Sequence, residues 1–477
     1  MATFKRPNVL VLYTDQQRVE TLGCYGNPIA KTPNIDALAM EGALFKNFFI
    51  NSPVCMSSRA CFLSGRYSSS HGVGTNGVTV PENLMTINKI MKPYGYHTAQ
   101  LGKLHFLPHI FRDHRDVHPD YGFDTIIISD EPGCYDDSYI KWVEMIDPEQ
   151  IPKVRTSLPS PARRLKAAGV GRQPSYSEVK RHTHTPYVFE GREDLTHTAF
   201  VTDLALNYLE SRKNHTEPFF CIVGFYAPHA PLNPPQRFID MYRLKDMPTP
   251  CKAPHEKWAQ EEFEKMSEDD WRGVWQHYLA LTSHIDESVG KIIQKLKEIG
   301  KYEETIIVFT SDHGEHMGDH GRIQKGMPGY DCIINVPFII SYPKAIKPGQ
   351  VLEQLCESVD FVPTILDYCG IQIPPFIQGS SLKPLLEGRI NEFKEEILVE
   401  MFEPFGKKET TIRTKRYKYY FSSDGEELLF DLVNDPLEFN DLSKDIRYKD
   451  ILSDMRRRMI ARIQQAAYPN LEKIFEV

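Results

Sequence analysis

The sequence predicts an α/β protein built on a doubly wound sheet. Three short apolar runs have the composition of strands buried on both faces of a parallel sheet, namely Asn8–Tyr13, Phe219–Phe225 and Thr305–Thr310. Helical patterns lie between them, at Thr196–Lys213 and Trp275–Gly300. Because strands and helices alternate along the chain, we expect helices on both faces of one mostly parallel sheet.

The pattern changes near residue 390. Three short segments then have the composition of antiparallel strands, Ile397–Met401, Thr410–Arg413 and Tyr417–Phe421, and a basic helix is expected over Tyr448–Gln465. We therefore predict a main α/β domain over residues 1–390 and a smaller C-terminal α+β subdomain over residues 391–477, with a small antiparallel sheet and a helix.

Composition limits the classes of partner. The 477 residues are 41% hydrophobic and 25% charged, which is ordinary for a globular protein. The net charge of -8 gives no sign of a nucleic-acid or membrane partner, so an anionic substrate would need a local cluster of cations. Nine scattered cysteines match neither a disulfide scaffold nor a CxxC zinc site. The N-terminus lacks a secretory leader, which predicts a cytoplasmic protein, or a periplasmic or secreted one if a leader was removed.

Polar residues follow the apolar runs at the point where each strand should end. Asp15 follows the first run, and Asp312 and His313 follow the third. In open α/β sheets the ligand site lies beyond the carboxyl ends of the strands. Cys55 and Arg59 lie between these groups in the sequence. Together they predict a metal site built around a nucleophile.

The segment Cys55–Arg59 (CMSSR) followed by Leu63–Arg66 (LSGR) resembles the C-x-P-S-R-x-x-x-x-T-G signature of the type I sulfatases. Residues 428–438 likewise resemble a segment of the smaller C-terminal subdomain of these enzymes. Two residues depart from the signature, since Ser57 replaces proline and Ser64 replaces threonine. The resemblance implies an alkaline-phosphatase-like fold and a sulfuric ester hydrolase.

The resemblance also implies a metal site. Residues 310–321 (TSDHGEHMGDHG) are similar to the family run S-D-H-G-E-x-x-G-D-H-G, which implies that Asp15, Asp312 and His313 bind one divalent cation. Gln16 stands where many members have a second aspartate and can bind through its side-chain oxygen. The family implies Ca²⁺, with Mn²⁺ or Zn²⁺ as alternatives.

In the family, the signature cysteine is oxidised to formylglycine (3-oxoalanine). The resemblance implies this change at Cys55, made by a formylglycine-generating enzyme or a radical maturase. The hydrated aldehyde offers one oxygen to attack sulfur and a second proton to expel the product. Arg59 would stabilise this group. Ser57 occupies a position that the maturation machinery reads, and serine is small enough to be accepted there.

Further matches imply residues that act on the sulfate. Residues 95–105 resemble G-Y-x-T-x-x-x-G-K-x-H, so that Lys103 would contact the sulfate and His105 would act on the second hydroxyl. His229, in a P-H-x-P turn, would donate to the leaving oxygen, and Lys325 would bridge the sulfate and the leaving group. Asn76 matches a position near the nucleophile or the sulfate, but its segment is equally a glycine-rich turn.

The expected reaction is hydrolysis of a sulfate monoester of a carbohydrate or small aryl alcohol, with no nucleic-acid or membrane partner. One alternative is a phosphonate monoester or phosphodiester hydrolase of the same superfamily, which shares the Asp-Gln and Asp-His pairs; Lys103 and His105 favour sulfate. Another is a non-catalytic binding protein with unmodified Cys55. The segment Phe106–Glu193, rich in His, Arg, Pro and Tyr, is predicted to form surface loops, or a lid that sets specificity.

Overall fold

The computed structural model describes residues 5–109, 112–157 and 185–467. Its centre is an eight-stranded sheet with the order β5-β4-β6-β1-β7-β8-β2-β9, in which β8 alone runs against its neighbours. The strands are β1 (Asn8–Asp15), β2 (Ala43–Phe45), β4 (His97–Gly102), β5 (Thr125–Ile128), β6 (Phe219–Pro228), β7 (Thr305–Ser311), β8 (Phe338–Ser341) and β9 (Gln350–Leu352). The three predicted strands are therefore β1, β6 and β7, which lie side by side at the centre.

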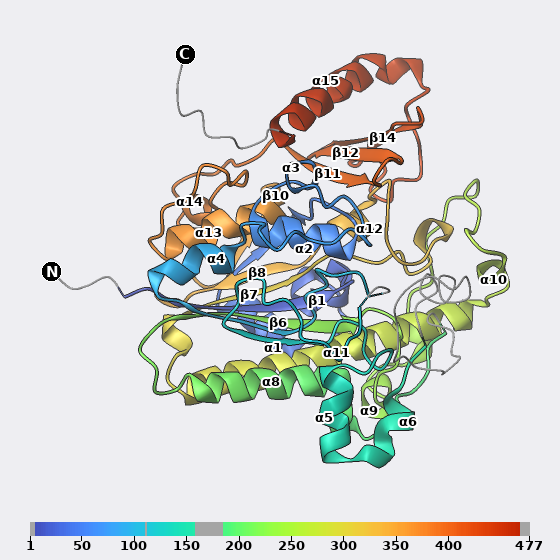
Figure 1. The fold of residues 1–477 in the computed structure, drawn as a ribbon. Coiled ribbons are helices and arrows are strands. Elements are labelled where there is room, and N and C mark those ends of the chain that lie inside the picture. Colours follow the sequence, from blue (N-terminus) through green and yellow to red (C-terminus); the bar gives the residue numbers. More distant parts are fainter. Residues whose placement is uncertain (1–4, 110–111, 158–184, 468–477) are drawn as a thin grey trace.

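Helices cover both faces of this sheet (Figure 1). Alternate side chains of β1 enter two different cores, with Val9 and Val11 on one face and Leu10 and Leu12 on the other. The first core is closed by α2 (Cys55–Ser64), α4 (Ile87–Met91) and α13 (Phe361–Tyr368), and the second by α1 (Pro33–Met40), α8 (His197–Ser211) and α11 (Glu268–Glu298). The predicted doubly wound α/β fold is confirmed.

The start of α11 lies seven residues before the predicted Trp275. Ser267 and Asp270 form a capping box there, in which each side chain accepts the backbone N–H of the other residue. The capping residues, and not the apolar periodicity, set where this helix begins.

A second, antiparallel sheet follows the central one and carries α15 (Lys449–Ala466) on one face (Figure 1). Its strands are β11 (Glu396–Phe402), β12 (Lys408–Thr414), β13 (Tyr417–Ser422) and β14 (Glu427–Asp431). The apolar side of α15 packs on this sheet through Leu452, Met455 and Met459. Division of the chain into two domains at residue 390 stays a prediction.

Short elements connect these parts. They are β3 (Phe48–Phe49), which pairs with β10 (Cys356–Glu357), and the helices α3 (Ser68–His71), α5 (Ser138–Ile146), α6 (Ile151–Val154), α9 (Gln236–Ile239), α10 (Glu261–Glu264), α12 (Asp331–Ile334) and α14 (Lys383–Leu386). Among the helices of the described ranges, none has the length and the apolar run needed to cross a bilayer.

The expectation of surface loops over Phe106–Glu193 is wrong for part of that segment. β5 extends the central sheet beside β4, and α5, which is capped by Asp137, buries Tyr139 and Val143 in the second core. The apolar run of β5 is only four residues long, which is too short for periodicity to distinguish it from a loop. Arg163–Lys166 and residues 182–184 lie outside the described residues, and a lid over the site stays a prediction.

Candidate active site

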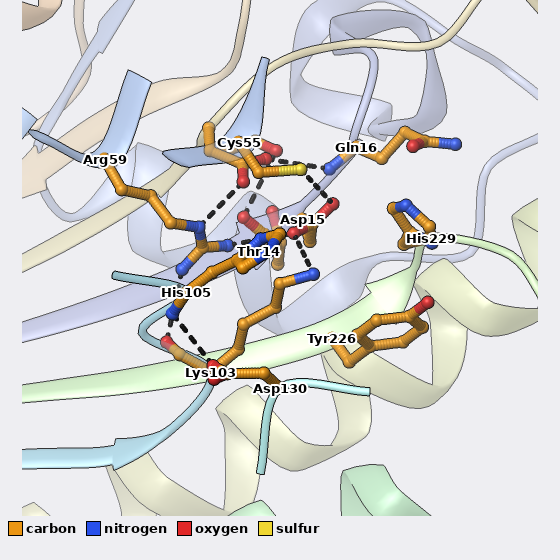
Figure 2. Close-up of polar contacts among 12 residues, drawn as sticks. Thr14, Asp15, Gln16, Cys55, Arg59, Lys103, His105, Asp130, Tyr226 and His229 are labelled. Atoms are coloured by element: carbon orange, nitrogen blue, oxygen red, sulfur yellow. Dashed lines mark hydrogen bonds and ion pairs between the residues drawn. The ribbon is translucent and has the colours of Figure 1, made fainter. Parts of the chain in front are cut away.

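The predicted site residues gather at the carboxyl ends of four adjacent strands. β4, β6, β1 and β7 run parallel and end at the same edge of the sheet. Asp15 is the last residue of β1, and Lys103, His229 and Asp312 directly follow the other three strands. Figure 2 shows Asp15, Cys55, Arg59 and Lys103 converging on one point at this edge. Because parallel strands place their carboxyl ends together, residues as far apart in sequence as Asp15 and Asp312 meet there.

Two of these strand ends turn sharply. Gln16 and His105 are non-glycine residues in the left-handed region, with φ of 64° and 55°. An aspartate holds each turn: the backbone N–H of Gln16 donates to Asp312 Oδ1 over 3.0 Å, and that of His105 donates to Asp130 Oδ1 over 2.8 Å. The strained backbone is held by specific acceptors, as is common where function requires a fixed side-chain direction.

Cys55 is the first residue of α2, which points its N-terminus at the sheet edge. Asn76 accepts the Met56 N–H over 3.0 Å, and Ser58 Oγ donates to the Asp312 carbonyl over 2.6 Å. Asn76 therefore fixes the start of this helix beside the nucleophile position. A helix N-terminus also favours negative charge, so α2 suits an anionic group at residue 55.

Ser57, which departs from the family signature, is fully buried in the first turn of α2. Its hydroxyl donates to the Val73 carbonyl over 2.6 Å and lies 2.8 Å from Ser68 Oγ. Serine at this position thus ties α2 to the segment that leads to Asn76. A proline would leave the Val73 carbonyl without this donor.

Four side chains form a group that can hold a metal ion. One ligand atom from each of Asp15, Cys55, Asp312 and His313 lies within 4.8 Å of the others, and all four residues are buried. His313 Nδ1 is 2.8 Å from the Gly314 carbonyl and donates to it, which leaves Nε2 3.7 Å from Asp15 Oδ1 and 3.6 Å from Asp312 Oδ1. Two buried carboxylates with an oriented imidazole fit a divalent cation.

The side chain of Gln16 is directed toward Glu315, whose carboxylate accepts from its amide nitrogen. Figure 2 shows this side chain extending away from the Cys55 sulfur. Its Oε1 is buried and has no hydrogen-bond partner among the described residues. That a metal ion binds to Gln16 stays a prediction.

Arg59 and Lys103 are buried cations paired with the two carboxylates. Arg59 Nε lies 2.8 Å from Asp312 Oδ2 and Nη2 lies 3.2 Å from Asp15 Oδ2, while Lys103 Nζ lies 2.8 Å from the same Asp15 oxygen. Burial raises the pKa of Asp15, but Lys103 and the neighbouring cations outweigh burial and hold that pKa well below its usual value. Asp15 is therefore ionised at neutral pH.

Lys325 lies beside the sulfur of Cys55. Its Nζ is 2.6 Å from Sγ and 3.4 Å from His229 Nε2, and His229 Nδ1 is 2.7 Å from the Ala230 carbonyl. Burial, reinforced by Asp15, raises the pKa of the Cys55 thiol to about 11 although Lys325 opposes it. An unmodified Cys55 in these surroundings is a protonated thiol at neutral pH and a weak nucleophile.

Positive charge is left unpaired beside Cys55. Arg59 and Lys103 form ion pairs with Asp15 and Asp312, whereas Lys325 forms no ion pair among the described residues and lies against Sγ, which leaves an excess of positive charge at this point. A divalent cation would add to this excess. In a buried site this imbalance favours an anionic substrate group.

His105 lies at the left-handed turn that follows β4. Its ring stacks on His109 with 4.7 Å between centroids, and no hydrogen bond joins it to Cys55 in the described ranges. Burial and then Lys103 hold its pKa well below the ordinary value. His105 is thus a neutral imidazole at neutral pH, and its role in turnover stays a prediction.

The sequence analysis missed three residues of the site. Asp130 holds the turn at His105, Tyr226 lies under Lys103 with Nζ 4.4 Å from its ring centroid, and Ser58 anchors α2 to the end of β7. Asp130 could have been found by the signal that revealed Asp15, because an apolar run, Ile126–Ile128, directly precedes Ser129 and Asp130.

Comparison with known proteins identifies the family of this chain. The sulfatase family model matches residues 7–371, and the model of the C-terminal region of N-sulphoglucosamine sulphohydrolase matches residues 318–465. The chain is 31% identical to an arylsulfatase of Clostridium perfringens, over 96% of this chain and 95% of that protein. It is 28% identical to an N-acetylglucosamine-6-O-sulfatase of Bacteroides thetaiotaomicron, over 93% and 84% of the two chains.

Two solved structures share the fold. A protein in complex with its substrate D-glucosamine-2-N,6-O-disulfate superposes with a TM-score of 0.75 at 24% identity, covering 99% of this chain and 100% of that one. A phosphonate monoester hydrolase of Agrobacterium radiobacter gives a TM-score of 0.77 at 24% identity, covering 96% of each chain. At this identity the likeness shows the fold alone. Because the family match runs from the first strand of the central sheet to beyond α13, the protein belongs to the sulfatase family and is a sulfatase of the alkaline phosphatase superfamily.

Proposed function

We propose that this sulfatase hydrolyses sulfate monoesters of carbohydrates or small aryl alcohols, with a nucleophile derived from Cys55. The observation that carries the proposal is the position of Cys55, which lies at the N-terminus of α2, inside the group of Asp15, Asp312 and His313, and 2.6 Å from Lys325. The arylsulfatase and the N-acetylglucosamine-6-O-sulfatase among its relatives are named for leaving groups of these two kinds.

Residues of this chain would hold two groups that supply the chemistry. Formylglycine at residue 55 supplies a hydrated aldehyde as nucleophile, and a divalent cation, which we propose to be Ca²⁺, supplies Lewis acidity. Asp15, Asp312 and His313 would hold the cation. Arg59 keeps the two carboxylates in place through its planar fork, which lysine could not reproduce.

The remaining residues act on the ester. Lys325 and Lys103 place positive charge around the sulfate oxygens, where negative charge grows as the S–O bond breaks. His229 donates through Nδ1 to the Ala230 carbonyl, so its Nε2 accepts from Lys325. Lys325 carries the proton of this pair and would donate to the departing alcohol oxygen, whereas His229 would donate to that oxygen itself only with Nε2 protonated. Water completes the hydrolysis, and the products are the alcohol and inorganic sulfate.

Maturation and turnover provide the test. The chain should be produced with and without a formylglycine-generating enzyme and assayed on an aryl sulfate and on monosaccharide 6-O-sulfates. We expect turnover only in the matured preparation. Equal turnover of both preparations would contradict a nucleophile made from Cys55.

A second candidate function is phosphonate monoester hydrolysis. The Asp15-Gln16 and Asp312-His313 pairs favour it, because the phosphonate hydrolases of the superfamily often carry the same pairs. Lys103 and His105 favour sulfate instead. The ratio of kcat/KM for an aryl sulfate and an aryl phosphonate monoester decides between them: a ratio above one supports the sulfatase proposal, and a ratio below one supports the alternative.

The non-catalytic alternative that the sequence raised has its own signature. It predicts a thiol at residue 55 in the chain from its native host, together with binding of a sulfated ligand without turnover. The maturation experiment separates this outcome from both enzymatic ones, because an aldehyde with turnover excludes it.

A further inference from the structure

A second group of possible metal ligands lies beside the reaction centre. One ligand atom from each of His105, His109 and Glu131 lies within 4.8 Å of the others. These residues come from the segments that follow β4 and β5, which are neighbouring strands of the central sheet. None of the three belongs to the Asp15, Asp312 and His313 group, and two of them lie in the His-rich segment that the proposed function did not use.

The three side chains are nearly buried. His105 is 7% exposed and Glu131 is 8% exposed, and the His109 side chain is 11% exposed. His105 Nδ1 has no hydrogen-bond partner among the described residues. An unpartnered buried imidazole nitrogen costs free energy, and a metal ion that accepts its lone pair removes that cost.

Glu131 is oriented as a ligand would be. The Tyr226 hydroxyl lies 3.0 Å from Glu131 Oε2 and 2.8 Å from the Ala230 carbonyl, and the other carboxylate oxygen, Oε1, lies 3.7 Å from His109 Nε2. Two ligands of one tetrahedral zinc ion are separated by about 3.3 Å, since each lies about 2.0–2.1 Å from the metal. The His105 and His109 rings are stacked with 19° between their planes, so one imidazole must rotate before both rings can direct a nitrogen at one ion. Tyr226 is placed to supply the outer hydrogen bond that ligating carboxylates commonly have.

The backbone around His105 is also fixed. Asp130 Oδ1 accepts the N–H groups of Leu104 and His105 over 2.9 and 2.8 Å, which fixes the turn that carries the imidazole. Two cations lie near the group, but Lys103 is paired with Asp15 at 2.8 Å and Arg112 lies 3.8 Å from Asp130 Oδ2, which reduces their repulsion of a metal ion. Glu131 and Asp130 place two carboxylates near His105 and His109.

The geometry points to a second metal site at His105, His109 and Glu131 that takes Zn²⁺ or a similar first-row transition ion. Two imidazoles and one carboxylate, with a position left open, are typical of zinc, whereas Ca²⁺ prefers a shell of oxygens. The chain would thus carry two cation sites that prefer different metals. The site at Asp15 and Asp312 would take Ca²⁺, and the site at His109 and Glu131 would take Zn²⁺ or a similar ion.

Zinc at this site would inhibit turnover, because it would hold the His105 ring away from the Cys55 position. This consequence rests on the proposed function, since it assumes that His105 takes part in the reaction. Binding of zinc does not rest on it. The binding measurement therefore tests the zinc site, and the activity measurement tests the role of His105. Either one can fail without the other.

The test is a calorimetric titration of the calcium-loaded full-length chain with ZnCl₂, together with diffraction at the zinc absorption edge. We expect one zinc per chain, with anomalous density between His105, His109 and Glu131. His109→Ala and Glu131→Gln should each weaken zinc binding by at least about tenfold. The matched control is His277→Ala, which removes a partly buried imidazole of α11 that donates to the Gly273 carbonyl, and it should bind zinc like the parent chain.

Three results would overturn the inference. They are the absence of zinc binding to the calcium-loaded chain, zinc density only at the Asp15 and Asp312 group, and unchanged affinity in His109→Ala. Anomalous diffraction uses the unsubstituted protein, so the test holds even if a variant folds poorly. In the activity arm, zinc should reduce turnover of the parent and of His277→Ala at least about tenfold more than that of His109→Ala.

Discussion

Two clusters of buried charge in this protein look alike but differ in balance. At the sheet edge, Arg59 and Lys103 pair with Asp15 and Asp312, while Lys325 forms no ion pair among the described residues and lies beside Cys55. An anchoring cluster elsewhere pairs Arg413 and Lys418 with Asp331 and Glu438. The anchoring cluster joins β12 and β13 to α12, with ion pairs of 2.5–2.9 Å, and its formal charges cancel. A balanced cluster serves to hold two parts together. An excess of positive charge around a helix N-terminus instead prepares a place for an anion.

The largest expected effect comes from residue 55. Cys55→Ala should reduce kcat on an aryl sulfate by about 10⁴-fold or more, because it removes the nucleophile that covalent catalysis requires. Cys61→Ala is the matched control, since Cys61 is a buried cysteine of the same helix. Its turnover should stay within about threefold of the parent, as its effect is confined to packing. Comparable losses in both variants would place the effect in α2 as a whole.

Removal of the metal ion is expected to come next. Dialysis against a chelator should lower turnover by at least about 10²-fold, because the Lewis acidity that activates the nucleophile is lost. Added Ca²⁺ should restore turnover. Full turnover of a chain shown by elemental analysis to hold no metal would remove the role proposed for Asp15, Asp312 and His313.

Paired lysine substitutions sharpen the comparison directly. Lys325→Met should lower kcat/KM by about 10²–10³-fold with an unfolding free energy near that of the parent, since it removes the excess charge. Lys418→Met should do the reverse. It should lower the unfolding free energy by about 3–5 kcal/mol, because Glu438 is left buried without its partner, and change turnover per folded molecule little. Denaturant unfolding measures the stability of each variant, and steady-state kinetics measures its turnover. A loss of stability in Lys325→Met together with a loss of turnover in Lys418→Met would contradict the roles given to the two clusters.

The smallest expected effect is the pH dependence of the anchoring cluster. Burial raises the pKa of Asp331, but Arg413 and Lys418 outweigh it and hold that pKa well below its usual value. The stability that Asp331 contributes is therefore present above the unfolded pKa of about 3.9 and is lost as pH falls toward the folded value. The difference in unfolding free energy between the parent and Asp331→Asn should shrink below about pH 4. A difference that stays constant between neutral and acid pH would show that the ionised carboxylate contributes nothing.

Strand-end patterns made much of this site predictable. The continuous apolar runs that became β1, β6 and β7 identified the centre of the sheet, and the acids and histidines after them lie where parallel strands place their ends. The same reasoning failed for β5, whose run is too short, and so it missed Asp130. It could not foresee that Ser57 binds the Val73 carbonyl or that His105 stacks on His109, because these contacts depend on side-chain directions set by tertiary packing.

The most direct test of the account is the chemical state of residue 55 in the active enzyme. Mass spectrometry of the peptide that contains Cys55 and Arg59, from the native host, should show an aldehyde whose abundance rises in proportion to the specific activity of each fraction. A fully active fraction in which residue 55 is entirely a thiol would contradict the central claim.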